Sequence, residues 1–255
     1  MIKKKKLDLS ENSKKILDDD TPFAIRESFN QLRTNIVYSV KPDSGCPVYG
    51  ITSAGESAGK STVATNLALS FTNVYKKVLL IDADMRCPTI HKFFGLDKKG
   101  KGLSELLSGI TKDDSEIIQN VHNENLYVIT SGCIPPNPSE LILSNILTEH
   151  LEKWKKEFDI IFIDFPPVGI VTDPLAVAKD ITGYIFIVRA NFSDSRKVSA
   201  AINSMEQVGA KIFGVVLNDV PLKGSGKSNY AEGEKRYKYK YGYKYRNASK
   251  YARKK

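Results

Sequence analysis

The chain is organised around Tyr49-Gly-Ile-Thr-Ser-Ala-Gly-Glu-Ser-Ala-Gly-Lys-Ser-Thr62. The apolar run 48–51 precedes a turn rich in Gly, Ser and Ala, and apolar side chains then recur at helical spacing from residue 63 to residue 71. A phosphate-binding loop needs this position between a strand and a helix. We therefore predict that the phosphates of a nucleotide bind to Ala54, Gly55, Glu56, Ser57, Ala58, Gly59, Lys60, Ser61 and Thr62.

Each part of this loop has a chemical task. Small residues let backbone N–H groups approach a phosphate, and the N-terminus of the following helix faces the anion. Lys60 is placed to reach the outer phosphates, and the hydroxyl of Ser61 is a ligand for Mg²⁺. Alanine stands at position 54, where the pattern usually has its first glycine, so we expect a backbone there without a positive φ.

Further apolar runs alternate with helical patterns. We predict buried strands at 48–51, 78–81, 126–130, 158–164, 183–188 and 211–217. A helix is expected from Thr21-Pro22 onward, short helices within 87–125, and one long helix capped by Ser139 and reaching about residue 157. Because strands alternate with helices without hairpin signals, the sequence predicts an α/β domain with a parallel sheet and helices on both faces.

The charge is distributed unevenly along the chain. Of a formal net charge of +9, residues 223–255 contribute twelve Lys or Arg against two Asp or Glu, and the other 222 residues carry 26 basic and 27 acidic side chains. We therefore divide the chain into a mobile charged arm (1–20), a nucleotide-binding domain that begins with a helix (21–222) and a basic tail expected to be disordered (223–255).

The composition also excludes several classes of protein. No apolar run approaches the roughly 18 residues that a membrane span needs, and the basic start at 1–6 is not followed by an apolar segment. The three cysteines lie far apart and form no C-x-x-C pair, which argues against a disulfide framework or a zinc site. We expect a cytoplasmic protein that neither is secreted nor spans a membrane by itself.

Three carboxylates follow the ends of predicted strands: Asp82, Asp84 and Asp164. Right-handed crossovers bring the C-terminal ends of parallel strands to one edge of the sheet, so these acids should gather beside Lys60 and Ser61. Mg²⁺ prefers oxygen ligands, keeps several waters and bridges the β- and γ-phosphates. The sequence therefore predicts a Mg²⁺–nucleotide site that transfers a phosphoryl group to either water or a phenol.

The basic tail favours the phenol. It holds seven of the twelve tyrosines, namely Tyr230, Tyr237, Tyr239, Tyr241, Tyr243, Tyr245 and Tyr251. Lys and Gly separate the alternating members and no apolar partner is evident, so we expect a solvated segment. Two other interpretations are stacking on single-stranded nucleic acid, which is less favoured, and contact with anionic lipid.

Four features together resemble the bacterial tyrosine kinases of capsule and exopolysaccharide systems (BY-kinases), in the form that works with a separate membrane adaptor. Residues 53–61 are similar to the Walker A loop of that family, Leu80-Ile-Asp-Ala-Asp-Met-Arg86 to its Walker A′ motif, residues 160–167 to its Walker B motif, and the tail to its tyrosine cluster. The resemblance covers about residues 21–251.

This resemblance implies a fold of the P-loop NTPase type with ATP and Mg²⁺ as cofactors. Lys60 would bind the phosphates, and Ser61 and Asp164 would hold Mg²⁺ directly or through water. Asp82 would be the base or polariser nearest the phenol, close to the metal, and Asp84 would support the metal. The implied catalytic residues are thus Lys60, Asp82, Asp84 and Asp164, and the implied metal ligands are Ser61, Asp82 and Asp164.

The resemblance also implies a biological role and partners. The chain would phosphorylate the tail tyrosines of another copy and other proteins, control polysaccharide polymerisation and export, and be recruited to the inner face of the membrane by a transmembrane adaptor of the chain-length type. The family assembles rings through an E-x-x-R-x-x-R helix, in which Glu27 and Arg33 match here and Asn30 replaces the middle arginine.

Two other functions compete with the kinase. A Min/Par-type ATPase would bind membrane or DNA, but Gly55 stands where those ATPases carry a second lysine. A regulatory module with little catalytic activity would use the tail only for docking.

Overall fold

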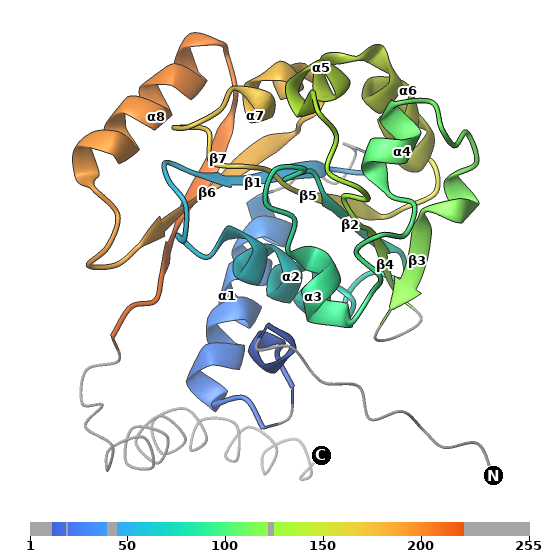
Figure 1. Ribbon diagram of the computed structural model, residues 1–255. Helices are drawn as coiled ribbons and strands as arrows, with labels where there is room; N and C mark the ends of the chain where they lie inside the picture. Colours follow the sequence, from blue (N-terminus) through green and yellow to red (C-terminus); the bar gives the residue numbers. More distant parts are fainter. Residues whose placement is uncertain (1–11, 19, 40–44, 122–124, 222–255) are drawn as a thin grey trace, which may run out of the picture.

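The computed structural model describes residues 12–18, 20–39, 45–121 and 125–221 (Figure 1). Its centre is a seven-stranded sheet in the order β3-β4-β2-β5-β1-β6-β7. The strands are β1 (Val48–Ser53), β2 (Val78–Asp82), β3 (Ile118–Val121), β4 (Leu126–Ile129), β5 (Ile160–Asp164), β6 (Gly183–Arg189) and β7 (Ile212–Asn218). Every neighbouring pair is parallel except β3 and β4, so the predicted α/β class with a largely parallel sheet is confirmed.

Helices cover both faces of the sheet (Figure 1). One face carries α1 (Phe23–Ser39), α2 (Lys60–Phe71) and α3 (Ile90–Phe94). The other carries α4 (Leu103–Leu107), α5 (Pro138–Leu143), α6 (Asn145–Trp154), α7 (Asp173–Ala176) and α8 (Ser195–Gln207). Short 3₁₀ helices are η1 (Ser13–Lys15), η2 (Asp114–Glu116) and η3 (Ala178–Asp180). No helix in the described part of the chain has the length and apolar character needed to cross a bilayer.

The two layers bury separate cores because alternate strand residues point to opposite faces. Leu79 and Ile81 face the core under α4 to α8, whereas Val78 and Leu80 face the core under α1 to α3. The three central strands β1, β2 and β5 are buried along their whole length, as expected for a parallel sheet covered on both sides.

The region 87–125 contains a strand where we predicted only short helices. Ile118 pairs with Ile129 and Val121 with Leu126 in an antiparallel ladder, so β3 and β4 form a hairpin whose connecting residues 122–124 lie outside the described residues. β3 has only four residues at the edge of the sheet, which is too short for its periodicity to be distinguished from a helical pattern.

The predicted helix over 139–157 is in fact two helices. Ser144 lies between α5 and α6 with φ −68° and ψ 146°, an extended conformation that interrupts the helix. Its hydroxyl donates to the carbonyl of Leu141 at 2.6 Å, the kind of local side-chain bond that competes with helix continuation. Ser139 does not cap α5, because Pro138 already occupies the first helical position.

Residues 12–18 differ from the mobile arm that we expected. The backbone N–H of Leu17 donates to the side-chain oxygen of Asn66 at 2.8 Å, and the side-chain amide of Asn66 donates to the carbonyl of Lys15 at 2.8 Å. Ile16 packs against the core under α1 to α3. The charged composition concealed this apolar residue, which docks the segment on α2. The first eleven residues and the basic tail lie outside the described residues.

Candidate active site

The loop between β1 and α2 passes twice through the left-handed region of backbone space. Ser57 has φ 57° and Gly59 has φ 89°, whereas Ala54 has no positive φ, as predicted for an alanine at that position. At Gly59 a Cβ atom would lie 2.1 Å from the side-chain nitrogen of Asn218. Glycine is therefore required at position 59 by both conformation and space.

Side chains from the ends of β6 and β7 hold this loop. Asn218 donates to the carbonyl of Ala58 at 3.0 Å, and Arg189 donates to the carbonyl of Ser57 at 3.2 Å. Arg189 also forms an ion pair with Asp219 at 2.9 Å. Arg189, Asn218 and Asp219 were not among the predicted site residues. Like the acids, they are polar residues at the C-terminal ends of parallel strands, where ligands bind.

Asp82 and Asp164 lie side by side on neighbouring strands. They are register partners in the β2–β5 pair, and strand alternation directs both side chains toward α2 and α3. Both are fully buried. Burial raises the pKa of Asp164 to about 7, while the nearby charge of Lys60 and the hydroxyl of Ser61 act in the opposite direction. The structure thus brings together the lysine, the serine and two of the acids that we predicted to gather.

Asp82 has a second task in the fold. Its Oδ2 atom accepts the backbone N–H groups of Thr89 at 3.0 Å and Ile90 at 2.9 Å, which anchors the start of α3. Burial and repulsion from Asp164 raise the pKa of Asp82 well above its usual range. Asp84 lies on the wall of the adjoining cleft, where its Oδ1 atom accepts the backbone N–H of Cys87 at 3.0 Å.

The buried acids fit a magnesium ion held together with a nucleotide. Both carboxylate oxygens of Asp164 and Oδ1 of Asp82 are buried without a hydrogen-bond partner in the described part of the protein. Unpaired buried oxygens are costly, and a cation would satisfy them. Within the described residues no three His, Cys, Asp or Glu side chains form a ready-made metal cage. The unpaired carboxylate oxygens near Ser61 suit Mg²⁺, which takes much of its coordination from phosphates and water.

A cleft of about 680 Å³ opens above these acids. Its lining includes loop residues 59–62, Asp84 and Arg86 on one strand end, Arg189 and Asn218 on others, and residues of the docked N-terminal segment. Asp82 and Asp164 lie beneath its surface. The volume is within the range of small-molecule binding sites.

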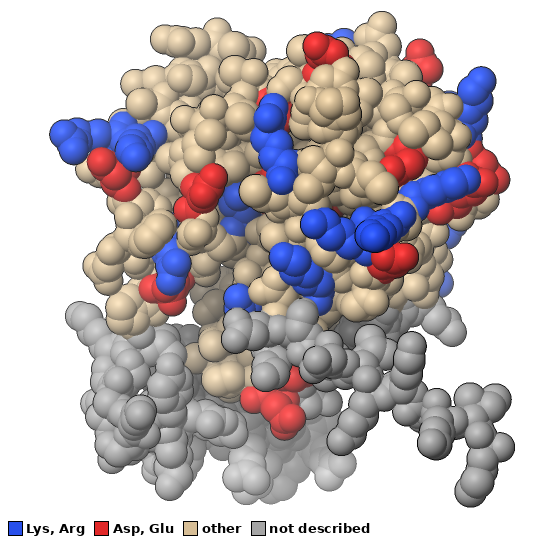
Figure 2. Space-filling model, viewed as in Figure 1, with Lys and Arg blue, Asp and Glu red and all other residues tan. Residues whose placement is uncertain are grey.

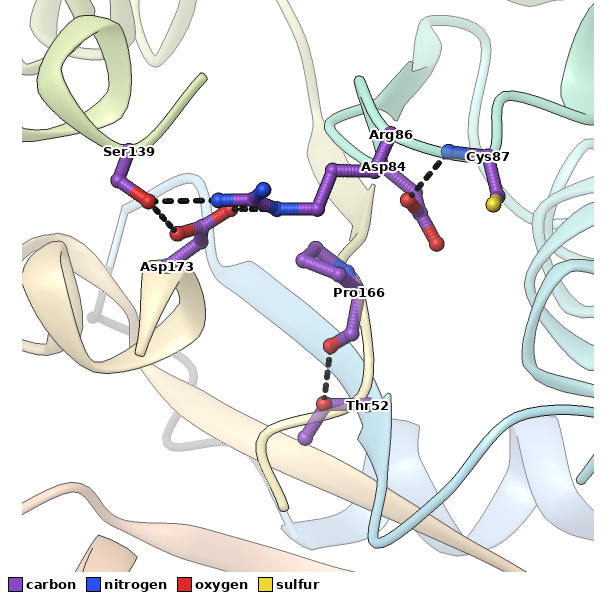
Figure 3. Close-up of polar contacts among 7 residues, drawn as sticks. All are labelled: Thr52, Asp84, Arg86, Cys87, Ser139, Pro166 and Asp173. Atoms are coloured by element: carbon purple, nitrogen blue, oxygen red, sulfur yellow. Dashed lines mark hydrogen bonds and ion pairs between the residues drawn. The ribbon is translucent and has the colours of Figure 1, made fainter. Parts of the chain in front are cut away.

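Arg86 is fixed at the cleft by two residues from distant parts of the chain (Figure 3). Its Nε atom lies 3.4 Å from Oδ2 of Asp173, and its Nη2 atom donates to the hydroxyl of Ser139 at 2.8 Å. That hydroxyl donates in turn to Oδ1 of Asp173 at 2.6 Å. The triad of Arg86, Ser139 and Asp173 therefore fixes a cation at the cleft wall, with its guanidinium group directed away from Asp84 (Figure 3).

A threonine at the end of β1 positions the segment that follows Asp164. The hydroxyl of Thr52 donates to the carbonyl of Pro166 at 2.8 Å (Figure 3) and accepts the backbone N–H of Val168 at 3.1 Å. These bonds place Pro166 and its neighbour in the cleft wall.

The residues matched to the ring-assembly motif lie on α1. Arg33 donates to the carbonyl of Ser70 at 2.6 Å near the end of α2, and Glu27 accepts the side-chain amide of Asn30 at 3.3 Å. Arg33 is thus bonded within its own chain. The seven tail tyrosines lie outside the described residues.

Comparison with known proteins places the chain in a family. Residues 55–208 match the sequence model of a family described as AAA domain. Tyrosine-protein kinase CpsD of Streptococcus agalactiae is 37% identical over 210 residues, which cover 82% of this chain and 90% of that protein. The chain belongs to the bacterial tyrosine-protein kinase family.

Two further members agree. The putative tyrosine-protein kinase CapB of Staphylococcus aureus is 34% identical over 216 residues, covering 85% of this chain and 93% of that protein. The crystal structure of the chimerical protein CapA2B2 has a TM-score of 0.76 and 36% identity, and covers 82% of this chain and 91% of that chain. The resemblance to BY-kinases inferred from the motifs is confirmed.

Proposed function

We propose that this tyrosine-kinase family member uses ATP and Mg²⁺ to phosphorylate the tail tyrosines of another copy of itself, and other proteins on tyrosine. The observation that best supports the proposal is the isolation of Asp164, a buried carboxylate whose two unpaired oxygens lie close to Lys60 and Ser61. A carboxylate in that position is suited to binding a metal ion that is also bound to phosphate, rather than to a structural role.

Different residues of the cleft would have different roles in phosphoryl transfer. Lys60 and the loop backbone would hold the phosphates, and Ser61 and Asp164 would hold Mg²⁺ directly or through water. When bound, Mg²⁺–ATP supplies the phosphoryl group and neutralises its charge. The arrangement of Arg86 with Ser139 and Asp173 adds a fixed cation on the same cleft wall.

Asp82 and Asp84 are the two candidates for the base that accepts the proton of the incoming tyrosine. The family resemblance assigns that role to Asp82, whose Oδ1 atom is free but buried and whose Oδ2 atom anchors α3. Asp84 already lies on the cleft wall. Asp82 therefore acts as a base only if the start of α3 moves, whereas Asp84 can reach a substrate without that movement.

We test the kinase with purified full-length protein and Mg²⁺–ATP. Intact mass spectrometry should detect phosphate additions on the tail, and a Lys60→Met variant should acquire none. To test transfer between copies, the Lys60→Met chain is mixed with an active chain whose seven tail tyrosines are changed to phenylalanine. Phosphate on the Lys60→Met chain supports the proposal. ATP hydrolysis without tail modification would favour a Min/Par-type ATPase.

The cellular role follows from the family. We infer recruitment to the inner face of the membrane by a transmembrane adaptor, assembly with other copies, and control of capsule or exopolysaccharide polymerisation and export. A cytosolic segment of such an adaptor should raise the rate of tail phosphorylation. Basic and acidic side chains are interspersed over the face shown in Figure 2, which does not resemble a nucleic-acid-binding surface.

Phosphorylation should reverse the charge of the tail. Each phosphotyrosine adds about −1.5 to −2, so seven would add roughly −10 to −14 to a segment that carries ten more basic than acidic side chains. We expect the modified chain to leave acidic sites on neighbouring copies, so that oligomers dissociate. Light scattering on unmodified and fully phosphorylated protein measures this, and equal masses would refute it.

A further inference from the structure

The docked segment at 12–17, which we call the N-terminal strap, borders the nucleotide cleft. It lies beside α2 and α3, where Figure 1 draws its dark blue helical turn. Asn12 and Lys15 line the same cleft as loop residues 59–62. A part of the chain that precedes the nucleotide-binding motif by some forty residues thus contributes to the wall of the site.

A buried side chain on the P-loop helix holds the strap in place. Asn66 is only 2% exposed, accepts the N–H of Leu17 at 2.8 Å, and donates to the carbonyls of Lys15 at 2.8 Å and Thr62 at 3.0 Å. Thr62 lies in the first turn of α2, within the phosphate-binding motif. One amide therefore bonds to both the strap and that first turn, so the position of the strap depends on the helix that holds the phosphates.

The positive charge of Lys15 indicates which ligand the strap could contact. Lys15 is exposed, and its ammonium group donates to the side-chain oxygen of Asn12 at 3.1 Å, a contact on the cleft wall. A nucleoside triphosphate bound to the loop would bring several negative charges into this cleft. An exposed lysine beside phosphates gives up only a weak hydrogen bond when it exchanges a neutral amide oxygen for a charged phosphate oxygen.

We propose that the strap is part of the nucleotide site: the Lys15 ammonium group contacts the phosphates of the bound nucleotide, so docking of the strap and binding of nucleotide stabilise each other. The inference rests on the proposed function, because it requires a nucleotide in the cleft. Coupling of this kind is reciprocal, so a nucleotide that holds the strap must bind less tightly when the strap is released.

The experiment measures affinity for Mg²⁺–ADP by isothermal titration calorimetry on full-length protein. Lys15→Ala removes the charge, and Lys76→Ala is its matched control because Lys76 is exposed before β2, at the opposite end of that strand from the acids. Leu17→Pro removes the N–H that Asn66 accepts, and Leu17→Ala keeps it. Ile16 already has ψ 136°, the extended conformation that a residue before proline adopts.

We expect Lys15→Ala and Leu17→Pro to weaken binding about three- to tenfold, the loss of roughly one net hydrogen bond at an exposed position, with both controls within about twofold of wild type. The deficit of Lys15→Ala should shrink at high salt. Hydrogen exchange gives a second readout, since saturation with Mg²⁺–ADP should slow exchange of the Leu17 amide several-fold.

The possible results separate the inference from the function. Wild-type affinity in Lys15→Ala, with Leu17 exchange unchanged by nucleotide, overturns the inference while leaving the kinase intact. Absence of nucleotide binding by wild-type protein overturns both. Lys15→Ala changes one exposed side chain, so its result stands even if Leu17→Pro impairs folding.

Discussion

The Asp164→Asn variant is expected to be more stable than wild type at pH 8 in the absence of nucleotide, and to be inactive. Asp164 is fully buried with two unpaired oxygens, and its pKa is raised to about 7. In an unfolded chain the same carboxyl group has a pKa of about 3.9. Folding therefore opposes ionisation of this group, and a neutral amide of the same shape removes the penalty.

The pH dependence follows from the direction of the shift. Below about pH 4 the carboxyl is protonated in both states, so its ionisation does not affect stability. Between about pH 4 and 7 the folded state keeps a proton that the unfolded chain has released, so wild-type stability falls as pH rises. The advantage of Asn should therefore be small at pH 4.5 and reach its full value above pH 7.

We expect a gain of about 1–3 kcal/mol in the free energy of unfolding at pH 8, because a neutral amide replaces a carboxylate whose ionisation burial opposes. For a chain of this size, that gain raises the melting temperature by several degrees. Circular dichroism at pH 4.5 and pH 8 measures it. Asp173→Asn is the control, because Asp173 is equally buried but is bonded to Arg86 and Ser139, so its loss should destabilise.

The same substitution should reduce tail phosphorylation by at least about a hundredfold, since the proposed function gives Asp164 the role of holding the Mg²⁺ that acts on the transferring phosphoryl group. A gain in stability together with a loss of activity in Asp164→Asn would identify Asp164 as a site residue that lowers the stability of the fold. A variant less stable than wild type at pH 8 would contradict this account.

Arg86→Ala should reduce the rate of tail phosphorylation by about 10²-fold, the usual effect of losing a fixed cation at a phosphoryl-transfer site, while changing affinity for Mg²⁺–ADP by less than about threefold. Arg86 is held in place by Ser139 and Asp173 before any ligand arrives, so little reorganisation is needed. Arg86 lines the same cleft as Asp84 and loop residues 59–62.

Two variants separate charge from placement. Arg86→Lys keeps the charge but lacks the planar fork that contacts Ser139 and Asp173 together, so we expect it to recover little activity. Ser139→Ala removes one support and should cost about three- to tenfold. Rates come from intact mass and affinities from calorimetry. Parallel loss of ADP binding and melting temperature in Arg86→Ala would show that Arg86 only supports the fold.

Local patterns made the loop and the acids of the candidate site predictable from the sequence. The loop at 54–62 and the acids Asp82, Asp84 and Asp164 follow strands whose apolar runs are unmistakable, and parallel topology then brings their ends together. The same reasoning yields every strand of the sheet except β3, but it merges α5 and α6 into one helix.

Contacts between distant segments were not predictable in this way. Arg86 lies 53 residues from Ser139 and 87 from Asp173, and nothing in their local sequence indicates that they meet. The role of Asn66 was equally unpredictable from the sequence. A polar residue within a helix usually faces solvent, and only the folded chain shows that the strap covers this one. The break between α5 and α6 depends on the hydroxyl of Ser144, which donates to the preceding carbonyl of Leu141 instead of pointing to solvent.

The position of β7 bears on how far the tyrosines that follow it in the sequence could reach. Asn218, the last residue of β7, holds the phosphate loop and lines the cleft, so this strand ends at the rim of the candidate site. Tyr230 follows Asn218 by twelve residues in the sequence, a stretch that spans at most roughly 43 Å, whereas Tyr251 follows it by 33 residues and has about three times that span. Under the proposed transfer between copies, Tyr230 would reach only a closely packed neighbour, so the order in which the tail tyrosines become phosphorylated should report how closely the copies are packed.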